Sequence, residues 1–280
     1  MPLLFWTALA MTCFAANSVL NRLAFAGFHI GTVEFAWVRL ASGALVLALL
    51  VLWRHGAVLP GRKGRAGGVA GLVLYLFGFT FAYEALDAGT GALILFGAVQ
   101  LSMFAGAVLS RETIPARGRA GASLAFAGLV VLLWPGEVRL SPPHVGLMIA
   151  AGIGWGLYSL KGRGDEQPLI ATAANFALAL PVAVALGWLV GGARDWGDAQ
   201  GWIYAALSGA VTSGLGYALW YSILPALGAA RGGVAQLTVP LIAAAGGVAL
   251  IGEPLTWRFA LAAAIILGGV AWATWERKPG

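Results

Sequence analysis

Apolar stretches of roughly twenty residues recur along the whole chain and are separated by short polar connections. A helix needs about 20 predominantly apolar residues to cross the hydrocarbon core of a bilayer. The pattern therefore predicts an all-α membrane protein with ten transmembrane helices. We place these helices at 3–20, 33–53, 67–86, 89–109, 116–134, 144–161, 168–190, 200–224, 231–251 and 255–275.

The composition favours lipid as the solvent for most of the protein surface. Hydrophobic residues make up 60% of the chain and charged residues only 10%, whereas about a quarter of the residues of a soluble domain are charged. The net charge of +6 could indicate a nucleic-acid partner, but the basic residues lie in the short connections. The expected partners are therefore the lipid bilayer and a small-molecule substrate, and nucleic acid is not expected.

The distribution of lysine and arginine predicts the orientation, because cytoplasmic loops carry the excess of basic residues. With the N-terminus inside, the outer connections hold only Arg22, Arg139, Arg194 and Arg258. The inner connections and the C-terminal tail hold the larger set: Arg54, Arg62, Lys63, Arg65, Arg111, Arg117, Arg119, Lys161, Arg163, Arg231, Arg277 and Lys278. We therefore predict a multi-pass protein of a bacterial inner membrane with both termini in the cytoplasm.

The second half of the chain repeats the first after a shift of 141 residues, and the apolar segments stay in phase without a gap. The matched pairs include Phe14 with Trp155, Gly68 with Gly209, Glu112 with Glu253, and Trp134 with Trp275. We predict two five-helix repeats, over 1–141 and 142–280. Five is an odd number, so the second repeat must be inverted in the membrane, as in many secondary transporters. Alternatively, the duplication only builds a stable bundle for a receptor or an enzyme.

Several short motifs resemble the drug/metabolite transporter superfamily. Each half opens with an aromatic, small and polar run, Phe14-Ala15-Ala16-Asn17-Ser18 and Trp155-Gly156-Leu157-Tyr158-Ser159. Gly252-Glu253-Pro254-Leu255 resembles the loop of the EamA type, from which Ser110-Arg111 departs in the first half. The chain looks most similar to bacterial exporters of amino acids, including aromatic ones. That resemblance implies a secondary transporter that exports small metabolites by alternating access through a central cavity between the repeats.

The candidate substrate-binding residues are polar and aromatic side chains near the middle of the predicted helices, where a transporter binds its substrate. They occur as pairs one helical turn apart: Tyr75 with Phe79, Phe96 with Gln100, Trp155 with Tyr158, and Gln236 with Pro240. Such a cavity suits a neutral or aromatic amino acid, although a drug or another metabolite is an alternative. Pro240 is expected to kink its helix and free a carbonyl. Core packing and helix-to-helix hydrogen bonds are the structural alternatives.

Arg39 is the only basic residue that lies well inside a predicted helix, about five or six residues from its outer boundary, since the others in these ranges lie at helix ends. Ionisable groups within the membrane are costly and are functional candidates by default. We interpret Arg39 as part of a structural or gating ion pair near the outer face, with Glu34, Glu84 or Asp87 as its partner. The alternative is that it binds a carboxylate of the substrate.

The sequence offers no catalytic constellation, so we do not expect an enzyme. His29, His55 and His144 lie in predicted connections or at helix ends, without metal-ligand spacing or a nucleophile–base pair. We expect neither a cofactor nor a metal. No carboxylate lies at mid-depth, which favours a facilitated carrier without proton coupling, and a monomer is compatible with this plan. The remaining alternatives are an intramembrane enzyme and a lipid-handling protein, and the latter would have a groove open to lipid.

Overall fold

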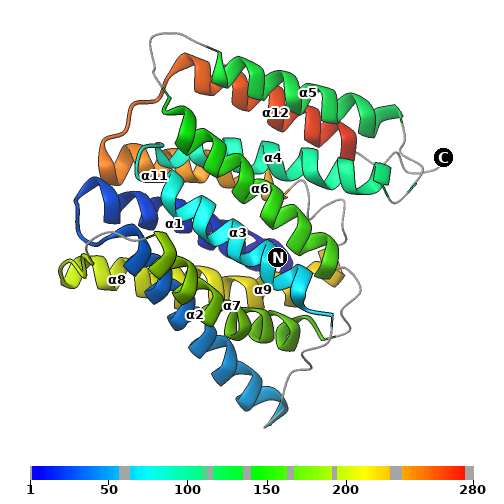
Figure 1. Cartoon of the computed structure of the whole chain (residues 1–280). Coiled ribbons are helices and arrows are strands. Elements are labelled where there is room, and N and C mark those ends of the chain that lie inside the picture. Colours follow the sequence, from blue (N-terminus) through cyan, green and yellow to red (C-terminus); the bar gives the residue numbers. More distant parts are fainter. Residues whose placement is uncertain are drawn as a thin grey trace.

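The computed structural model describes residues 2–56, 64–109, 111, 116–134, 140–162, 167–190, 194–227 and 235–274. Throughout this part of the chain the secondary structure is helical, and it contains no strand (Figure 1). The prediction of an all-α protein is confirmed. The helices are α1 (Pro2–Ala26), α2 (Thr32–His55), α3 (Ala66–Ala82), α4 (Ala88–Leu109), α5 (Ala116–Leu133), α6 (Pro142–Gly162), α7 (Pro168–Val190), α8 (Ala199–Leu207), η1 (Ser208–Leu215), α9 (Gly216–Leu227), α11 (Val239–Ile251) and α12 (Trp257–Thr274).

The predicted ends of the first and third helices are wrong. Helix α1 continues to Ala26, six residues beyond the predicted end, so Arg22 lies within the helix and not in an outer connection. The polar pair Asn21 and Arg22 interrupts the apolar run, but both side chains find partners inside the protein: Asn21 donates to Ser208 Oγ, and Arg22 to Glu253. Helix α3 ends at Ala82, four residues before the predicted end.

Pro240 follows a turn at residues 237–238 that separates α11 from the helical residues 235–236, so it does not lie inside a continuous helix. It occupies the first turn of α11, where a missing backbone N–H costs nothing because the first N–H groups of a helix have no partner within it. The predicted start of this span at residue 231 lies outside the described residues. Pro181, in contrast, does lie inside α7.

Length and apolar character make five of the described helices candidate membrane spans, at Leu3–Ala26, Thr32–His55, Ala88–Gly106, Ala116–Leu133 and Pro168–Val190. Shorter apolar helices lie at Ala66–Ala82, Val239–Ile251 and Trp257–Gly269. These lengths and compositions are those of a multi-pass membrane protein.

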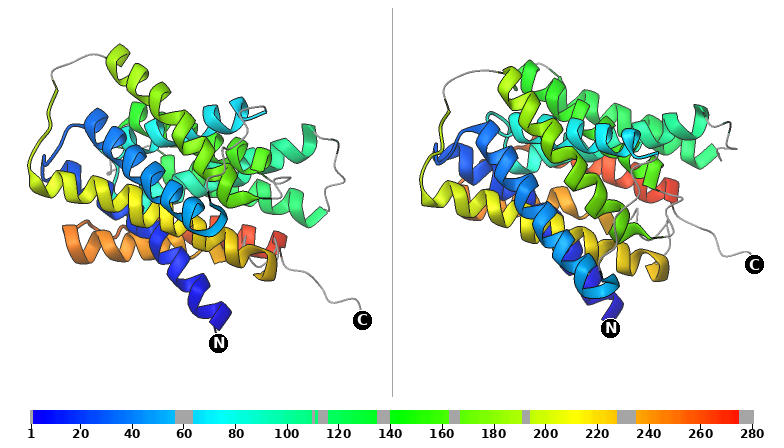
Figure 2. Two further views of the ribbon diagram at one scale, coloured as in Figure 1. Left: turned by 90° about the horizontal axis from the view of Figure 1, so that it is seen from below. Right: turned by 60° about the horizontal axis from the view of Figure 1, so that its bottom comes forward.

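The helices pack into a bundle in which segments far apart in sequence lie side by side. Helix α5 runs along α12 at one side, and α4 lies beside α6 and α11 (Figure 1). Helix α3 packs on α6, while α2 packs on α7 and on η1, as two further views show (Figure 2). A β-carbon on Gly71 would lie 2.8 Å from the carbonyl oxygen of Gly154. Backbone contact between α3 and α6 therefore depends on small residues, as is common between membrane helices.

The segment from α8 to α9 is one continuous helix whose middle, η1, has π-helical hydrogen bonding. Eight residues adopt this form, and such segments often occur at functional sites. Ser208, Thr212 and Ser213 on η1 are buried, and Gly209 lies directly against the backbone of α2 at Arg39. Thus η1 brings buried hydroxyl groups and a close helix contact to the middle of the bundle.

Candidate functional site

A central cavity lies where helices of both halves meet. It is small, about 20 Å³, which is room for about one water molecule. Helices α1, α3, α4, α6 and α9 line it, together with the segment just before α11. The lining residues are Phe14, Asn17, Ser18, Tyr75, Phe79, Leu95, Phe96, Trp155, Tyr217 and Gln236.

The structure gathers some of the candidate substrate-binding residues at this cavity and places others elsewhere. Five of the eight line it: Tyr75, Phe79, Phe96, Trp155 and Gln236. Gln100 and Pro240 are not among the lining residues. Tyr158 packs its ring 5.6 Å from that of Trp155 but lines a separate pocket of about 120 Å³ between α3, α6 and α7, beside Lys161 and Asn175.

The cavity wall is an aromatic cluster with Trp155 at its centre. The ring centroid of Trp155 lies 4.9 Å from that of Tyr75 and 5.1 Å from that of Tyr217. Tyr75 is in turn 5.2 Å from Phe79, and Phe14 is 5.7 Å from Tyr217. These separations are typical of favourable aromatic pairs, so the wall offers stacking surface for an apolar or aromatic group.

Sequence reasoning missed three prominent lining residues, Phe14, Asn17 and Tyr217, although the 141-residue repeat contains a signal for two of them. Phe14 is the counterpart of Trp155. Asn17 is the counterpart of Tyr158. Applying the repeat to each candidate in turn would have indicated both of these positions. Tyr217 is the counterpart of Leu76, which was not a candidate, so the repeat contains no signal for it.

A buried polar network lies directly behind the aromatic wall. Arg39 Nη2 donates to the Tyr75 hydroxyl at 3.2 Å and to Ser213 Oγ at 3.4 Å. The Tyr217 hydroxyl donates to that of Tyr75 at 3.4 Å. Asn17 Nδ2 donates to Ser213 Oγ at 3.2 Å, so the network joins both halves of the chain around the cavity.

The expected ion pair of Arg39 is wrong, because among the described residues it pairs with none of Glu34, Glu84 and Asp87. Arg39 is fully buried, whereas Glu34 pairs with Arg194 at 3.4 Å. Glu84 pairs with His144 at 3.6 Å and accepts a hydrogen bond from Thr32. Five residues of α-helix turn through about 140°, so Glu34 and Arg39 point to different sides of α2. Arg39 faces inward, where its guanidinium lies 4.9 Å from the ring centroid of Phe79.

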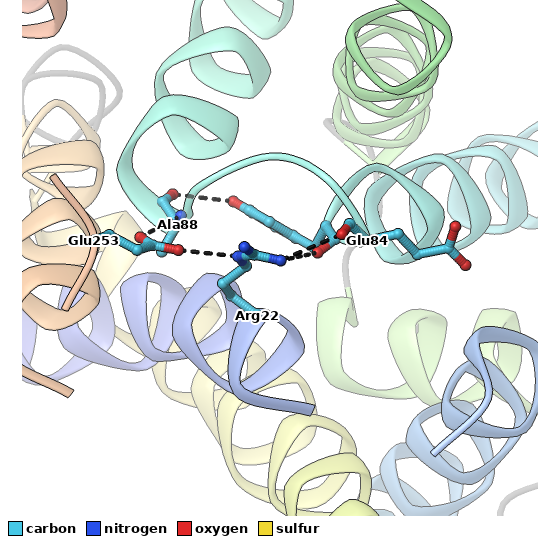
Figure 3. Close-up of polar contacts among 5 residues, drawn as sticks. Arg22, Glu84, Ala88 and Glu253 are labelled. Carbon is cyan, nitrogen blue, oxygen red and sulfur yellow. Dashed lines mark hydrogen bonds and ion pairs between the residues drawn. The ribbon is translucent and has the colours of Figure 1, made fainter. Parts of the chain in front are cut away.

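Polar contacts join the helix ends on the side of the bundle where α3 ends and α4 begins. Arg22 Nε donates to Glu253 Oε1 at 3.0 Å, and the backbone N–H of Ala88 donates to Glu253 Oε2 at 2.8 Å. Arg22 Nη1 also donates to the carbonyls of Tyr83 and Glu84, at 3.4 and 3.2 Å. Figure 3 shows how Arg22 and Glu253 together connect α1, the turn between α3 and α4, and the turn between α11 and α12.

Burial of Glu253 raises the pKa of its carboxyl group, while the N–H of Ala88 and the guanidinium of Arg22 oppose that rise. The same end carries a second, exposed contact, in which His29 Nδ1 lies 2.7 Å from Asp198 Oδ2. That contact and the N–H of Gly201 lower the pKa of Asp198. Glu34 with Arg194 adds a third contact at this end. Charged side chains therefore close this end of the bundle.

A larger hollow opens on the outside of the bundle, between α4, α5 and α6. It measures about 730 Å³ and is lined almost entirely by apolar side chains, among them Leu101, Phe126, Leu129, Ile153 and Leu157. An open apolar groove on a membrane helix bundle suits lipid chains rather than a polar metabolite. The groove and the central cavity are therefore separate features with different chemistry.

Comparisons with known proteins agree with this architecture. Residues 143–275 match the EamA-like transporter family. An uncharacterized protein of Pseudomonas aeruginosa is 46% identical over 267 residues, which cover 95% of this chain and 92% of that protein. An uncharacterized transporter of Archaeoglobus fulgidus is 22% identical over 275 residues, which cover 95% of this chain and 96% of that protein.

The fold also has a counterpart among solved structures. One crystal structure superposes with a TM-score of 0.67 at 22% sequence identity, covering 95% of this chain and 98% of the other. At that identity the likeness shows a shared fold. Together with the family match, it confirms the resemblance to the superfamily that the sequence motifs suggested. Residues 143–275 of this chain therefore belong to the EamA-like transporter family, and the relatives support the drug/metabolite transporter superfamily for the chain.

Proposed function

We propose that this membrane transporter exports small metabolites, above all neutral and aromatic amino acids, by alternating access through its central cavity. The observation that carries the proposal is the cavity wall itself: aromatic rings and amides from both halves of the chain converge on it. The cavity of about 20 Å³ is closed around its own side chains. Substrate entry therefore requires the helices on its two sides to move apart.

The helix packing supports two inverted repeats, 1–141 and 142–280, as the moving parts. Under the 141-residue shift, α3 packing on α6 corresponds to η1 and α9 packing on α1, and α4 on α6 corresponds to α11 on α1. The pairs α2–α7, α4–α11 and α5–α12 correspond to themselves. A two-fold axis between two similar halves would produce this reciprocal pattern. Halves of that kind can exchange conformations and expose the central site first to one side and then to the other.

The predicted orientation completes the proposal. Both termini lie in the cytoplasm of a bacterial inner membrane, and the end closed by Arg22, Glu253, Glu34 and Arg194 faces outward. With that end held shut, the helices would move apart first at the cytoplasmic end, and substrate would enter from the cytoplasm. Export of a metabolite made inside the cell would follow from that direction.

Transport is expected to run down the substrate gradient without a proton gradient. Among the described residues, those that line the cavity include no carboxylate or histidine that would take up a proton in each cycle. Purified protein in liposomes should therefore release loaded, labelled phenylalanine at the same rate with and without an imposed pH difference. A strict requirement for the pH difference would contradict a facilitated carrier.

Trp155→Ala is expected to lower the initial rate of phenylalanine flux at least about tenfold. The half-buried indole contacts Tyr75, Tyr158 and Tyr217, and a substrate ring stacked on it would lose an aromatic pair of about 1.5 kcal/mol, which is roughly tenfold in rate. Leu157→Ala is the matched control, because Leu157 lies on the same helix but faces the outer groove and is 45% exposed. Equal flux in both variants at equal protein content would rule out a substrate role for Trp155.

The outer groove favours one second candidate function, the handling of lipids. Its volume of about 730 Å³ and its apolar lining would accept acyl chains. A protein of that kind would exchange labelled phospholipid between the two leaflets of a liposome, and Leu157→Ala would affect this exchange more than Trp155→Ala. Phenylalanine flux without lipid exchange would favour the transporter.

A further inference from the structure

Arg39 is a buried cation whose charge is not balanced by any carboxylate in the described part of the protein. Its side chain is fully buried, and no ion pair between described residues includes it. Among the same residues, its Nε and Nη1 atoms have no hydrogen-bond partner. A buried charge without a counter-ion costs several kcal/mol. The protein therefore maintains an unfavourable charge at this position.

Arg194 shows how the same chain treats a comparable arginine elsewhere. Its guanidinium also stacks on aromatic rings, 5.0 Å from the centroid of Trp37 and 4.7 Å from that of Trp188. Unlike Arg39, it pairs with a carboxylate, Glu34, and it donates to the carbonyl of Gly187 at 2.9 Å. Aromatic stacking thus accompanies an ion pair at Arg194, whereas at Arg39 the counter-charge is missing.

The unbalanced charge lies behind two of the rings that line the central cavity. The guanidinium of Arg39 lies 5.5 Å from the ring centroid of Tyr75 and 4.9 Å from that of Phe79, and both rings line the cavity. The Tyr75 hydroxyl accepts hydrogen bonds from Arg39 and from Tyr217. A hydroxyl has one donor and two acceptor sites, so both acceptor sites of Tyr75 are used and its own hydrogen remains to donate.

The remaining polar groups of the wall are uncharged. They are the amides of Asn17 and Gln236 and the hydroxyls of Ser18 and Tyr217, and no acidic side chain is among the lining residues. A hydrogen bond donated toward an anion by a hydroxyl that a cation already polarises is stronger than one between neutral groups. The wall is therefore suited to a negatively charged group and unsuited to an isolated positive one.

We propose that the missing counter-charge is a carboxylate of the substrate, which accepts the Tyr75 hydrogen bond while Arg39 acts behind it as a positioning residue. The substrate class is thus a monocarboxylate with an apolar or aromatic body, a class that includes the neutral amino acids. The body packs among Phe14, Phe79 and Trp155, and the carboxylate lies toward Tyr75. Organic cations that lack a carboxylate are excluded. This inference deepens the proposed transport function and rests on the same cavity.

The test compares two ligands of nearly equal shape, 3-phenylpropionate and its uncharged amide, 3-phenylpropanamide. Binding is measured as a concentration-dependent rise in the melting temperature of the purified protein, since a ligand of the folded state stabilises it. Charge-assisted hydrogen bonds are about twice as strong as neutral ones, so the acid should bind at least about tenfold more tightly. Phenethylamine, a cation of similar size, should produce no rise.

Variants connect this preference to Arg39. Arg39→Met should reduce the acid-to-amide affinity ratio to about one, and Tyr75→Phe should lower it severalfold. Arg39→Lys keeps a positive charge and should retain most of the preference, which a merely structural role of the arginine would not predict. Arg194→Met is the control: it also removes a stacked arginine, but away from the cavity, so the ratio should remain as in the wild type.

The outcomes separate this inference from the proposed function. A wild-type protein that binds acid and amide equally, or neither, overturns the inference even if phenylalanine flux is observed. That comparison needs no variant, so it holds even if Arg39→Met does not fold. Selective binding of the acid that is lost in Arg39→Met supports the inference. If such binding occurs without any flux, the carboxylate site stands and transport is refuted.

Discussion

Replacing Gly209 by alanine is expected to destabilise the protein strongly and to lower both its melting temperature and its yield. A β-carbon at this position would overlap the carbonyl oxygen of Arg39 and the hydroxyl of Ser42. The first of these is a backbone atom, so the clash is relieved only by separating η1 from α2. Overpacking of this kind costs about 3 kcal/mol or more, which is a large fraction of the stability of a typical domain.

Gly146→Ala is the matched control for this substitution. Gly146 lies on α6, and a β-carbon there would meet no atom within 4 Å. Alanine is favoured over glycine in helices by about 1 kcal/mol. The melting temperature of the Gly146→Ala variant should therefore be equal to or above that of the wild type. The measurement is the yield of monodisperse protein in detergent together with thermal unfolding followed by tryptophan fluorescence. A Gly209→Ala protein with the wild-type melting temperature would show that η1 and α2 are not in close contact.

Glu253→Ala is expected to have the second largest effect, a loss of about 3 kcal/mol of stability. The side chain is only 7% exposed and accepts hydrogen bonds from Arg22 and from the backbone N–H of Ala88. Its removal leaves a partly buried guanidinium without its counter-ion and a buried N–H without its acceptor. Glu253→Gln keeps one acceptor oxygen without the charge, so its melting temperature should fall between those of the wild type and of Glu253→Ala.

The control at the same end of the bundle is Asp198→Asn. Asp198 accepts from the backbone of Gly201 as the N-cap of α8, and asparagine caps helices equally well. Only the exposed pair with His29 is lost, and exposed pairs contribute little to stability. Its melting temperature should therefore match that of the wild type. An equal loss in Asp198→Asn and Glu253→Ala would contradict a specific role for the contacts shown in Figure 3.

The closure at this end also predicts the direction of a functional change. If Arg22 and Glu253 hold α1, α4 and α11 together, weakening the contact favours the conformation that is open on that side. The test uses a protein with a single cysteine near the cavity, in a Cys13→Ser background. Adding Glu253→Gln should make this cysteine react faster with a membrane-impermeant thiol reagent that is applied from that side. An unchanged reaction rate would separate the role of Glu253 in stability from any role in gating.

Much of the fold could be predicted from the sequence because lipid imposes a simple rule on the chain. Each membrane helix must be apolar over its whole length, so helix positions such as 168–190 follow directly from composition and match α7. The errors occur where polar residues are paired inside the protein. In the sequence, Asn21 and Arg22 interrupt the apolar run and so predict the end of a span, but their partners Ser208 and Glu253 lie more than 180 residues away.

The candidate site was predictable only in part, for a related reason. Aromatic residues such as Tyr75 and Trp155 stand out at mid-helix, and the structure places both at the cavity. Gln100 and Pro240 share the same spacing pattern but are not among the lining residues. Spacing defines the face of a helix that a residue occupies, but not what that face contacts.

The sequence by itself determined that the chain is a bundle of apolar helices and that it resembles one transporter superfamily, and it predicted a repeat after 141 residues. These properties depend on local stretches of sequence, since each helix meets the requirement of the bilayer separately. The tertiary structure decided which side chains share a space. Arg39 illustrates the difference: from the sequence it is a charge within reach of Glu34, but the rotation of α2 turns it inward against Tyr75 and Ser213. The role of a charged side chain depends on the groups around it, and those groups are known only once the helices are packed.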